Sequence, residues 1–182
     1  MNLKPEILKA IKRSGFEEAT PIQEKTIPLV LEGKDVIGQA QTGTGKTAAF
    51  GLPILQNLDK QHDSIQAIII EPTRELAIQT QEELFRLGRD EKARVQVVYG
   101  GADIRRQIRA LKQTPAILVG TPGRLLDHLK RGTIDISKVK TIVLDEADEM
   151  LDMGFIQDIE SILRYASCKH HTLILSATRP KP

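Results

Sequence analysis

The sequence predicts an α/β protein with a central parallel sheet of about six to seven strands and helices on both faces of the sheet. The first observation is that short, nearly all-apolar runs, such as residues 67–70 and 116–119, alternate with longer amphipathic segments. The second is that these runs lack the alternation of apolar and polar residues that a half-exposed strand shows. Strands that are buried on both faces and separated by helices are typical of parallel sheets.

The elements follow in order along the chain. Residues 1–33 are expected to form two helices packed on the core, the first ending at Gly15 and the second starting at Thr20. Residues 34–182 are expected to form the core domain. Its strands are predicted at residues 36–37, 67–70, 95–99, 116–119, 141–144 and 172–175. Its helices are predicted near residues 46–58, 74–87, 104–111, 124–130 and 155–164.

Length and composition limit the class of protein further. The 182 residues correspond to about one domain, and 40% hydrophobic with 27% charged residues excludes a disordered or collagen-like chain. Cys168 is the single cysteine, so no internal disulfide forms, and no apolar run is long enough for a membrane span. The first residues lack the apolar core of a signal peptide. We therefore expect a cytoplasmic monomer with no membrane partner.

The charge is unevenly distributed, although the net charge is only +2. Residues 86–131 hold eleven Lys and Arg against four Asp and Glu, whereas residues 141–163 hold seven Asp and Glu and no basic residue. A basic segment can bind phosphates and an acidic cluster can bind a divalent cation, with solvated helix faces as the alternative. Because the chain has only four Phe, two Tyr and no Trp, a bound nucleic acid is expected to be held by its backbone.

Histidine and cysteine do not indicate a transition-metal site. His62, His128, His170 and His171 have no partner Cys or His at the spacing of metal ligands, so all four are expected at the surface. Cys168 has no neighbouring base and is expected to be inert.

The most specific motif is the glycine-rich run that follows the first predicted strand of the core and opens a predicted helix. It consists of Ala40, Gln41, Thr42, Gly43, Thr44, Gly45, Lys46 and Thr47. In a loop that binds ATP, glycines let backbone N–H groups face the phosphates, the Lys reaches the β- and γ-phosphates, and the Thr hydroxyl ligates Mg²⁺. Ala40 departs from the usual pattern, which begins with glycine. The alternative is a glycine-rich turn with an exposed lysine, but the flanking strand and helix favour the phosphate loop.

Residues 145–148 read Asp-Glu-Ala-Asp and follow the apolar strand predicted at residues 141–144. Enzymes with a phosphate loop place a magnesium-coordinating Asp at the end of such a strand, so Asp145 is the predicted metal ligand together with Thr47. Glu146 is placed to accept a proton from an attacking water, which predicts hydrolysis. The candidate catalytic residues are therefore Glu146, Lys46 and Asp145. The alternative is a helix N-terminus whose acids face the helix dipole.

With these two sites, the chain resembles the first RecA-like domain of a DEAD-box ATP-dependent RNA helicase, most closely the bacterial, cold-shock-type members. Seven motifs stand in the family's order over nearly the whole chain. Besides the two sites above, they are Gly15-Phe16 with residues 20–23, residues 72–76, Gly100-Gly101, residues 121–124 and residues 176–178. The resemblance implies a RecA-like P-loop domain. It also implies an enzyme that uses ATP and Mg²⁺ to unwind or remodel short RNA duplexes.

The resemblance assigns further residues to ATP and to coupling. Phe16 and Gln23 would recognise adenine, and a carboxamide such as that of Gln23 can both donate and accept along the base edge. Asp148, Ser176 and Thr178 would couple hydrolysis to strand separation.

The resemblance also implies a surface for the RNA backbone. Its residues are Pro72, Thr73, Arg74, Gly101, Thr121, Pro122, Gly123 and Arg124. Hydroxyl, guanidinium and backbone N–H groups bind phosphate oxygens without reading bases. Thr73 and Thr121 also precede predicted helices, where a threonine can serve as the N-cap, and the two roles are compatible.

The family's second RecA-like domain supplies an arginine finger and the other half of the RNA clamp, and residues 1–182 contain only the first domain. We therefore expect two partners: that second domain, and RNA bound without sequence preference. Residues 1–182 alone are expected to be nearly inactive. Two rival functions stay open: a DNA translocase with the same ATP machinery, and a nucleotide-gated RNA-binding module that does not turn over.

Overall fold

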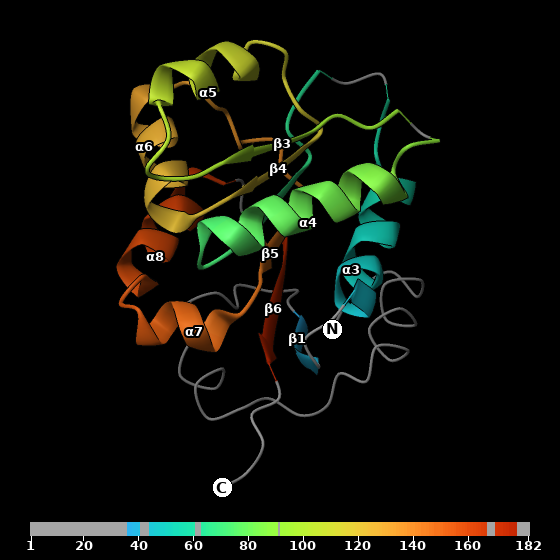
Figure 1. Ribbon diagram of the computed structural model, residues 1–182, viewed down its shortest axis with the longest axis vertical. Helices are drawn as coiled ribbons and strands as arrows, with labels where there is room; N and C mark the ends of the chain where they lie inside the picture. The colour runs from blue at the N-terminus through green and yellow to red at the C-terminus, as the bar shows by residue number, and fades with distance from the viewer. Residues whose placement is uncertain (1–35, 41–43, 61–62, 91, 167–169, 178–182) are drawn as a thin grey trace, which may run out of the picture.

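The computed structural model describes residues 36–40, 44–60, 63–90, 92–166 and 170–177 (Figure 1). In this part of the chain, six strands form one sheet in the order β1-β6-β5-β2-β4-β3, each parallel to its neighbours. The strands are β1 (Val36–Ala40), β2 (Ala67–Ile70), β3 (Val95–Val98), β4 (Ile117–Gly120), β5 (Thr141–Leu144) and β6 (His171–Ala177). The predicted parallel sheet is confirmed.

Helices cover both faces of this sheet. They are α3 (Thr44–Gln56), α4 (Arg74–Leu87), α5 (Ile104–Leu111), α6 (Pro122–Arg131), α7 (Ala147–Asp152) and α8 (Ile156–Tyr165). One core forms between the sheet and α3 with α4, and a second forms between the sheet and α6, α7 and α8. Ile69 belongs to the first core, whereas Ile68 and Ile70 belong to the second. Because both faces are buried, consecutive positions in the strands are apolar.

Most predicted elements agree with the structure within two residues at each end. The ranges of β2, β5, α4 and α5 match the prediction. β1 runs three residues further than predicted, because it pairs with β6 as far as Ala40 opposite Ala177. Helix α7 was not predicted, since six residues are too few to show a helical period. The two helices predicted within residues 1–33 lie outside the described residues.

The carboxyl ends of the parallel strands share one edge of the sheet. Gly120 ends β4 at this edge, and a Cβ there would lie 2.6 Å from Cγ of Leu125. Only glycine therefore lets α6 pack this closely on the strand, and α6 carries the predicted motif at residues 121–124. Within the described residues, no helix is both long and apolar enough to span a membrane.

Candidate functional site

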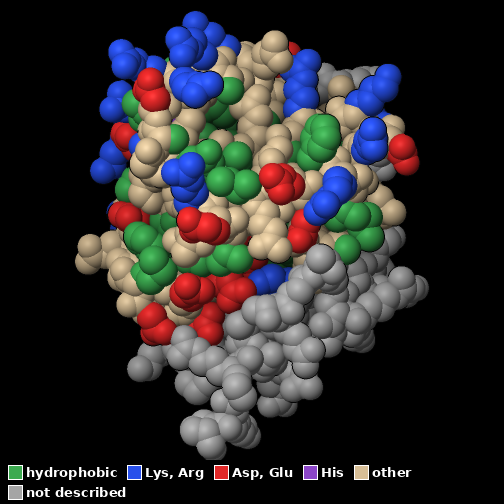
Figure 2. Space-filling model, viewed as in Figure 1, with side chains coloured by type: hydrophobic (Ala, Val, Ile, Leu, Met, Phe, Trp, Pro, Cys, Tyr) green, Lys and Arg blue, Asp and Glu red, His purple; other side chains and the backbone are tan. Residues whose placement is uncertain are grey.

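The carboxyl edge of the sheet divides into two halves. The carboxylate half follows β1, β6 and β5 and includes Glu71, the first residue after β2. The arginine half consists of the residues from Pro72 onward after β2 and of those after β4 and β3. Figure 2 shows the Asp and Glu side chains gathered over α7 and the Lys and Arg side chains gathered over α5. The uneven charge in the sequence therefore corresponds to two separate regions of the surface.

In the carboxylate half, Lys46 reaches from the first turn of α3 to the end of β5. Its Nζ lies 2.8 Å from Oδ1 of Asp145 and donates a hydrogen bond of 2.7 Å to Oε1 of Glu146. The Lys46 side chain is only 8% exposed, so the alternative of an exposed lysine in a glycine-rich turn is wrong. The fold brings the three predicted catalytic residues into direct contact.

Burial and charge act against each other in this triad. Burial disfavours the ammonium of Lys46, but Asp145 and Glu146 outweigh it and raise the pKa of Lys46 above its ordinary value. Burial also raises the pKa of the Glu146 carboxyl, and the hydrogen bond from Lys46 opposes that rise. Lys46 is therefore held as a cation, while Glu146 is a stronger base than a solvated carboxylate.

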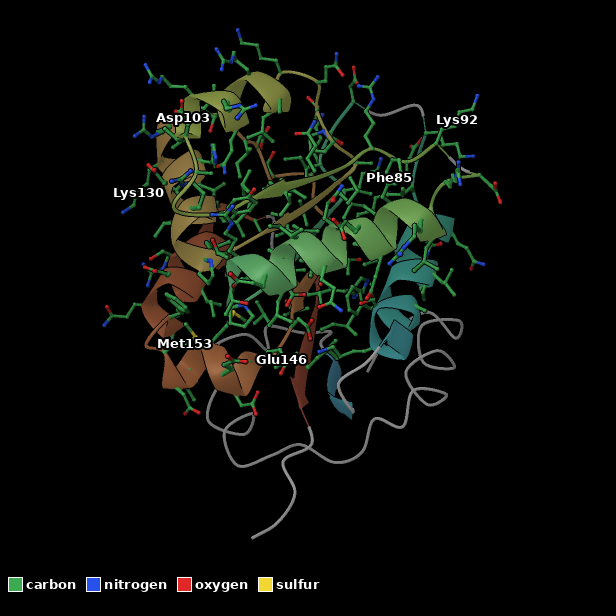
Figure 3. The ribbon with its side chains drawn as sticks, viewed as in Figure 1. Phe85, Lys92, Asp103, Lys130, Glu146 and Met153 are labelled. Atoms are coloured by element: carbon green, nitrogen blue, oxygen red, sulfur yellow. The ribbon has the colours of Figure 1, made fainter. Side chains whose placement is uncertain are left out.

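Glu146 lies where β5 passes into α7 (Figure 3). Its backbone is left-handed, with φ 51° and ψ 48°, a conformation that costs a residue with a side chain on the order of 1–3 kcal/mol. Its backbone N–H donates to Oδ1 of Asp145 at 3.0 Å. Asp148 follows in the first turn of α7, so acids do stand at a helix N-terminus. Since Lys46 holds Asp145 and Glu146, the two interpretations of this motif are compatible.

Glu71 is a member of this half that the sequence analysis missed. Ile70 pairs with Leu144 at the ends of the neighbouring strands β2 and β5, and Glu71 and Asp145 directly follow them. The Glu71 side chain is fully buried, and one of its oxygens accepts a 2.7 Å hydrogen bond from the Thr80 hydroxyl. Burial raises the pKa of Glu71 well above its usual range, and the neighbouring Asp145 carboxylate raises it further. A protonated Glu71 can donate to Asp145.

Glu71 had a signal in the sequence. It follows an apolar run of four residues, and Asp145 likewise follows a run of three. What the sequence lacked was the order of the strands, which places β2 directly beside β5.

The phosphate-loop residues are described in part. Ala40 ends β1, Thr44 and Gly45 begin α3, and Thr47 is buried in the first turn of that helix. Gln39 pairs with Ser176 and Ala40 with Ala177, so these two residues of the motif lie beside the end of β1. The predicted residues that lie outside the described ranges are Phe16, Gln23, Gln41, Thr42, Gly43 and Thr178.

The arginine half begins with the residues after β2. Thr73 is the N-cap of α4, and its Oγ1 accepts a 3.2 Å hydrogen bond from the backbone N–H of Leu76. Pro72 is buried, whereas Arg74 is exposed and its guanidinium lies 4.7 Å from the centre of the Tyr99 ring. This contact joins the end of β2 to the end of β3 and leaves the charge of Arg74 at the surface.

The residues after β4 complete this half. Thr121 is the N-cap residue of α6 without a side-chain cap bond, and Pro122 takes the first helical position. Nη1 of Arg124 donates to the backbone carbonyl of Ala102 at 3.1 Å and to Oε1 of Gln107 at 3.0 Å. Gly123 and Gly101 are exposed, and Gly101 has a φ of 84°. The described residues predicted to bind the RNA backbone thus lie along one continuous part of the edge.

The prediction of four surface histidines was wrong for His128. His128 is completely buried on α6, with Nε2 3.0 Å from Oε1 of Gln107 and Nδ1 2.7 Å from the Thr133 hydroxyl. Its position three residues after Leu125 on an amphipathic helix was the signal for burial. His170 and His171 are half-buried, and His62 lies outside the described residues.

Comparisons with known proteins agree with this geometry. The chain is 71% identical over 180 residues to the ATP-dependent RNA helicase CshA of Limosilactobacillus reuteri and 63% identical over 181 residues to the DEAD-box ATP-dependent RNA helicase CshA of Bacillus subtilis. The alignments cover 99% and 100% of this chain. The chain spans only 36% and 37% of these relatives, or about a third of their length.

Solved structures show the same fold. A DEAD box protein from Methanococcus jannaschii matches 99% of this chain with 47% identity and a TM-score of 0.74, and the match covers 49% of that chain. A hypothetical ATP-dependent RNA helicase from Sulfolobus tokodaii matches 98% with 41% identity and a TM-score of 0.71, and the match covers 52% of that chain. The family model for the DEAD/DEAH box helicases matches residues 20–182, and the chain belongs to this family.

Proposed function

We propose that this chain is the ATP-binding and RNA-backbone-binding domain of an RNA-dependent ATPase that unwinds or remodels short RNA duplexes. The observation that carries the proposal is the buried contact of Lys46 with Asp145 and Glu146, directly after a parallel strand. The names of the bacterial relatives support ATP and RNA as the ligands. We further propose that it acts as a monomer in the cytoplasm, joined to a second RecA-like domain.

The carboxylate half has the chemistry to receive ATP together with Mg²⁺. Asp145 and Glu146 already hold a cation, the Lys46 ammonium, in a buried site. Among the described residues, no three His, Cys, Asp or Glu are grouped as a metal site. Mg²⁺ would therefore be held by Thr47, Asp145 and phosphate oxygens rather than by a cage of protein ligands. Bound Mg²⁺ would neutralise charge that develops on the phosphates.

The side chains of the triad would then separate. The γ-phosphate competes for Lys46, which leaves the carboxylates and binds the phosphate oxygens. Glu146 loses the ammonium that lowers its pKa, while its burial remains. A buried carboxylate without its cation is a stronger base, and it would accept the proton of the attacking water.

The arginine half would hold an RNA strand by its phosphates. Arg74 and Arg124 supply guanidinium groups from neighbouring strand ends, and the starts of α4 and α6 add backbone N–H groups. None of these groups reads a base. RNA binding would therefore be independent of sequence and would weaken with salt.

Nucleotide binding is tested on residues 1–182 by titration with ATP, ADP, GTP and GDP in the presence of Mg²⁺. If Gln23 recognises adenine, ATP and ADP bind more tightly than the guanine nucleotides, and Gln23→Ala reduces the difference. Equal affinity for both purines contradicts the adenine assignment. If residues 1–182 bind none of the four nucleotides, the assignment of the phosphate site itself is contradicted.

Turnover is tested in two forms of the protein. Residues 1–182 alone should hydrolyse ATP very slowly, because an arginine finger contributes a factor of about 10³ to 10⁵ in related enzymes. A chimera in which this chain replaces the matching third of the Limosilactobacillus reuteri relative should regain hydrolysis stimulated by RNA. Equal stimulation by DNA of the same sequence favours the DNA translocase. Intact nucleotide and RNA binding without turnover in the chimera favours the gated binding module.

A further inference from the structure

A buried polar cluster connects α5 to α6 directly behind the arginine half. Its members are Gln107 on α5, His128 on α6 and Thr133 just after α6. His128 is completely buried and Gln107 is 9% exposed. Buried polar side chains are retained where their hydrogen bonds are satisfied, and the chemistry described so far does not use these residues.

The hydrogen bonds of Gln107 fix which way its carboxamide points. Its Nε2 donates to the backbone carbonyl of Tyr99 at 3.0 Å, and its Oε1 accepts from Nη1 of Arg124 at 3.0 Å. Rotating the amide by half a turn would place the NH₂ group against the Arg124 donor and the oxygen against a carbonyl. Oε1 therefore faces α6.

This orientation also determines the protonation of His128. Nε2 of His128 lies 3.0 Å from the same Oε1 of Gln107, so Nε2 carries the hydrogen and donates it. Nδ1 then accepts from the Thr133 hydroxyl, which lies 2.7 Å from Nδ1 and 3.0 Å from its other acceptor, the backbone carbonyl of His128. A neutral imidazole satisfies both contacts, and burial together with the positive charge of Arg124 lowers the pKa of His128 in agreement with this form.

The cluster uses only one nitrogen of Arg124. Both hydrogens of Nη1 are directed at acceptors, the carbonyl of Ala102 and the carboxamide of Gln107. In the described part of the chain, neither Nε nor Nη2 of Arg124 has a hydrogen-bond acceptor. The Nε and Nη2 hydrogens lie parallel along one edge of the guanidinium, and that edge can bind two oxygens of a phosphate at once.

We propose that Gln107 and His128 are positioning residues for Arg124, holding Nη1 so that the Nε–Nη2 edge is presented to a phosphate of the RNA backbone. This inference rests on the proposed function, because it assigns the partner of Arg124 as RNA. In this proposal Gln107 on α5 and His128 on α6 affect RNA binding without contacting the RNA themselves.

The first experiment measures the orientation of Arg124 without RNA. In the chimera labelled with ¹⁵N-arginine, NMR should show separate Nη1 and Nη2 signals for Arg124, because two hydrogen bonds slow rotation of the guanidinium. Gln107→Ala should merge these signals. Gln96→Ala is the matched control, since the Gln96 carboxamide bonds the carbonyls of Ala110 and Gln113 near the end of α5. Merged signals in the wild-type protein would overturn the positioning role whether or not the protein binds RNA.

The second experiment is a double-mutant cycle on the affinity of the chimera for a single-stranded RNA, with a non-hydrolysable ATP analogue present. Gln107→Ala and Arg124→Ala should each weaken binding about tenfold, as expected for a charge-assisted hydrogen bond. The double variant should be no weaker than Arg124→Ala alone. Thermal melts of each variant show whether weaker RNA binding comes from unfolding of the protein or from Arg124 no longer being held in place. If Gln107→Ala weakens binding as much in the Arg124→Ala background as in wild type, Gln107 does not act through Arg124.

A pair of His128 variants gives a test that keeps Gln107 in place. The amide nitrogen of His128→Gln can replace Nε2 and donate to Gln107, whereas the shorter His128→Asn replaces only Nδ1. RNA affinity should stay within about twofold for His128→Gln and fall several-fold for His128→Asn. Equal affinity of the two variants contradicts the role of His128. If Arg124 is held as expected but the wild-type chimera binds no RNA, the proposed function and the RNA part of this inference both fail.

Discussion

The two halves of the sheet edge hold their charged residues in opposite ways. In the carboxylate half, Lys46, Asp145 and Glu146 are buried against one another. In the arginine half, Arg74 and Arg124 contact neutral groups: an aromatic ring, a carbonyl and a carboxamide. A buried ion pair depends on every member, because removing one partner leaves a charge in the protein interior. An arginine held by neutral groups keeps its charge available for a ligand.

The comparison predicts that mutations in the carboxylate half affect folding and ligand binding together, whereas mutations in the arginine half affect ligand binding alone. The four predictions below test this contrast, from the largest expected effect to the smallest.

Lys46→Ala should have the largest effect. It removes the group that would bind the phosphates, so nucleotide affinity should fall at least 100-fold. It also leaves Asp145 and Glu146 without their cation, which should cost about 3–5 kcal/mol of folding stability at pH 7. The measurements are nucleotide titration and chemical unfolding, with the exposed Lys140→Ala as control. The loss of stability should shrink as the pH falls and the Glu146 carboxyl, whose pKa is raised by burial, takes up a proton. An unchanged stability at pH 7 would falsify the idea that the contact of Lys46 with Asp145 and Glu146 stabilises the folded protein.

Glu71→Gln should show the contribution of the buried carboxyl. The pKa of Glu71 is raised in the folded protein, so above the ordinary value of about 4.5 the unfolded chain releases a proton that the folded chain retains. The stability that Glu71 contributes is therefore complete below that pH and is lost as the pH rises toward the folded value. Glutamine keeps a donor for Asp145 and does not titrate. The variant should gain stability relative to wild type as the pH rises above about 4.5, measured by urea unfolding over a series of pH values.

Arg74→Ala should weaken RNA binding without unfolding the protein. Arg74 is exposed, so we expect a change in unfolding free energy within about 1 kcal/mol. In the chimera, RNA affinity should fall equally for every sequence, and the slope of log K against log salt should decrease by about 0.7 for the lost phosphate contact. Arg74→Lys is the matched variant that keeps the charge but loses the planar group over Tyr99. A preference for one RNA sequence that disappears on mutation would contradict binding through the backbone.

His128→Gln should give the smallest of the four effects, a change in the pH dependence of stability. The pKa of His128 is lowered in the folded protein, so below the ordinary value of about 6.5 the unfolded chain binds a proton that the folded chain does not. Stability should therefore decrease as the pH falls below about 6.5. His128→Gln removes this titration and should flatten that part of the curve. If both proteins lose stability equally between pH 6.5 and pH 5, His128 is not the group responsible.

Much of the fold could be predicted from local sequence. Residues 67–70 and 141–144 are short apolar runs, and α4 keeps a clear helical period, so their ends agree with the structure. The site motifs were also visible, because the glycines of the phosphate loop and the acids after β5 occupy consecutive positions. Such features depend on neighbouring residues, which the sequence displays directly.

The tertiary structure alone decided which of these residues meet. Glu71 lies beside Asp145 because β2 pairs with β5, and strand order is not encoded in any one segment. Lys46 is buried because α3 places it against residues 100 positions further along the chain. His128 is buried with Gln107 of α5 as a hydrogen-bond partner, 21 positions away in the chain. The sequence therefore determined the elements and the types of chemical group, and long-range packing determined the burial, the pairing and the protonation that make them a site.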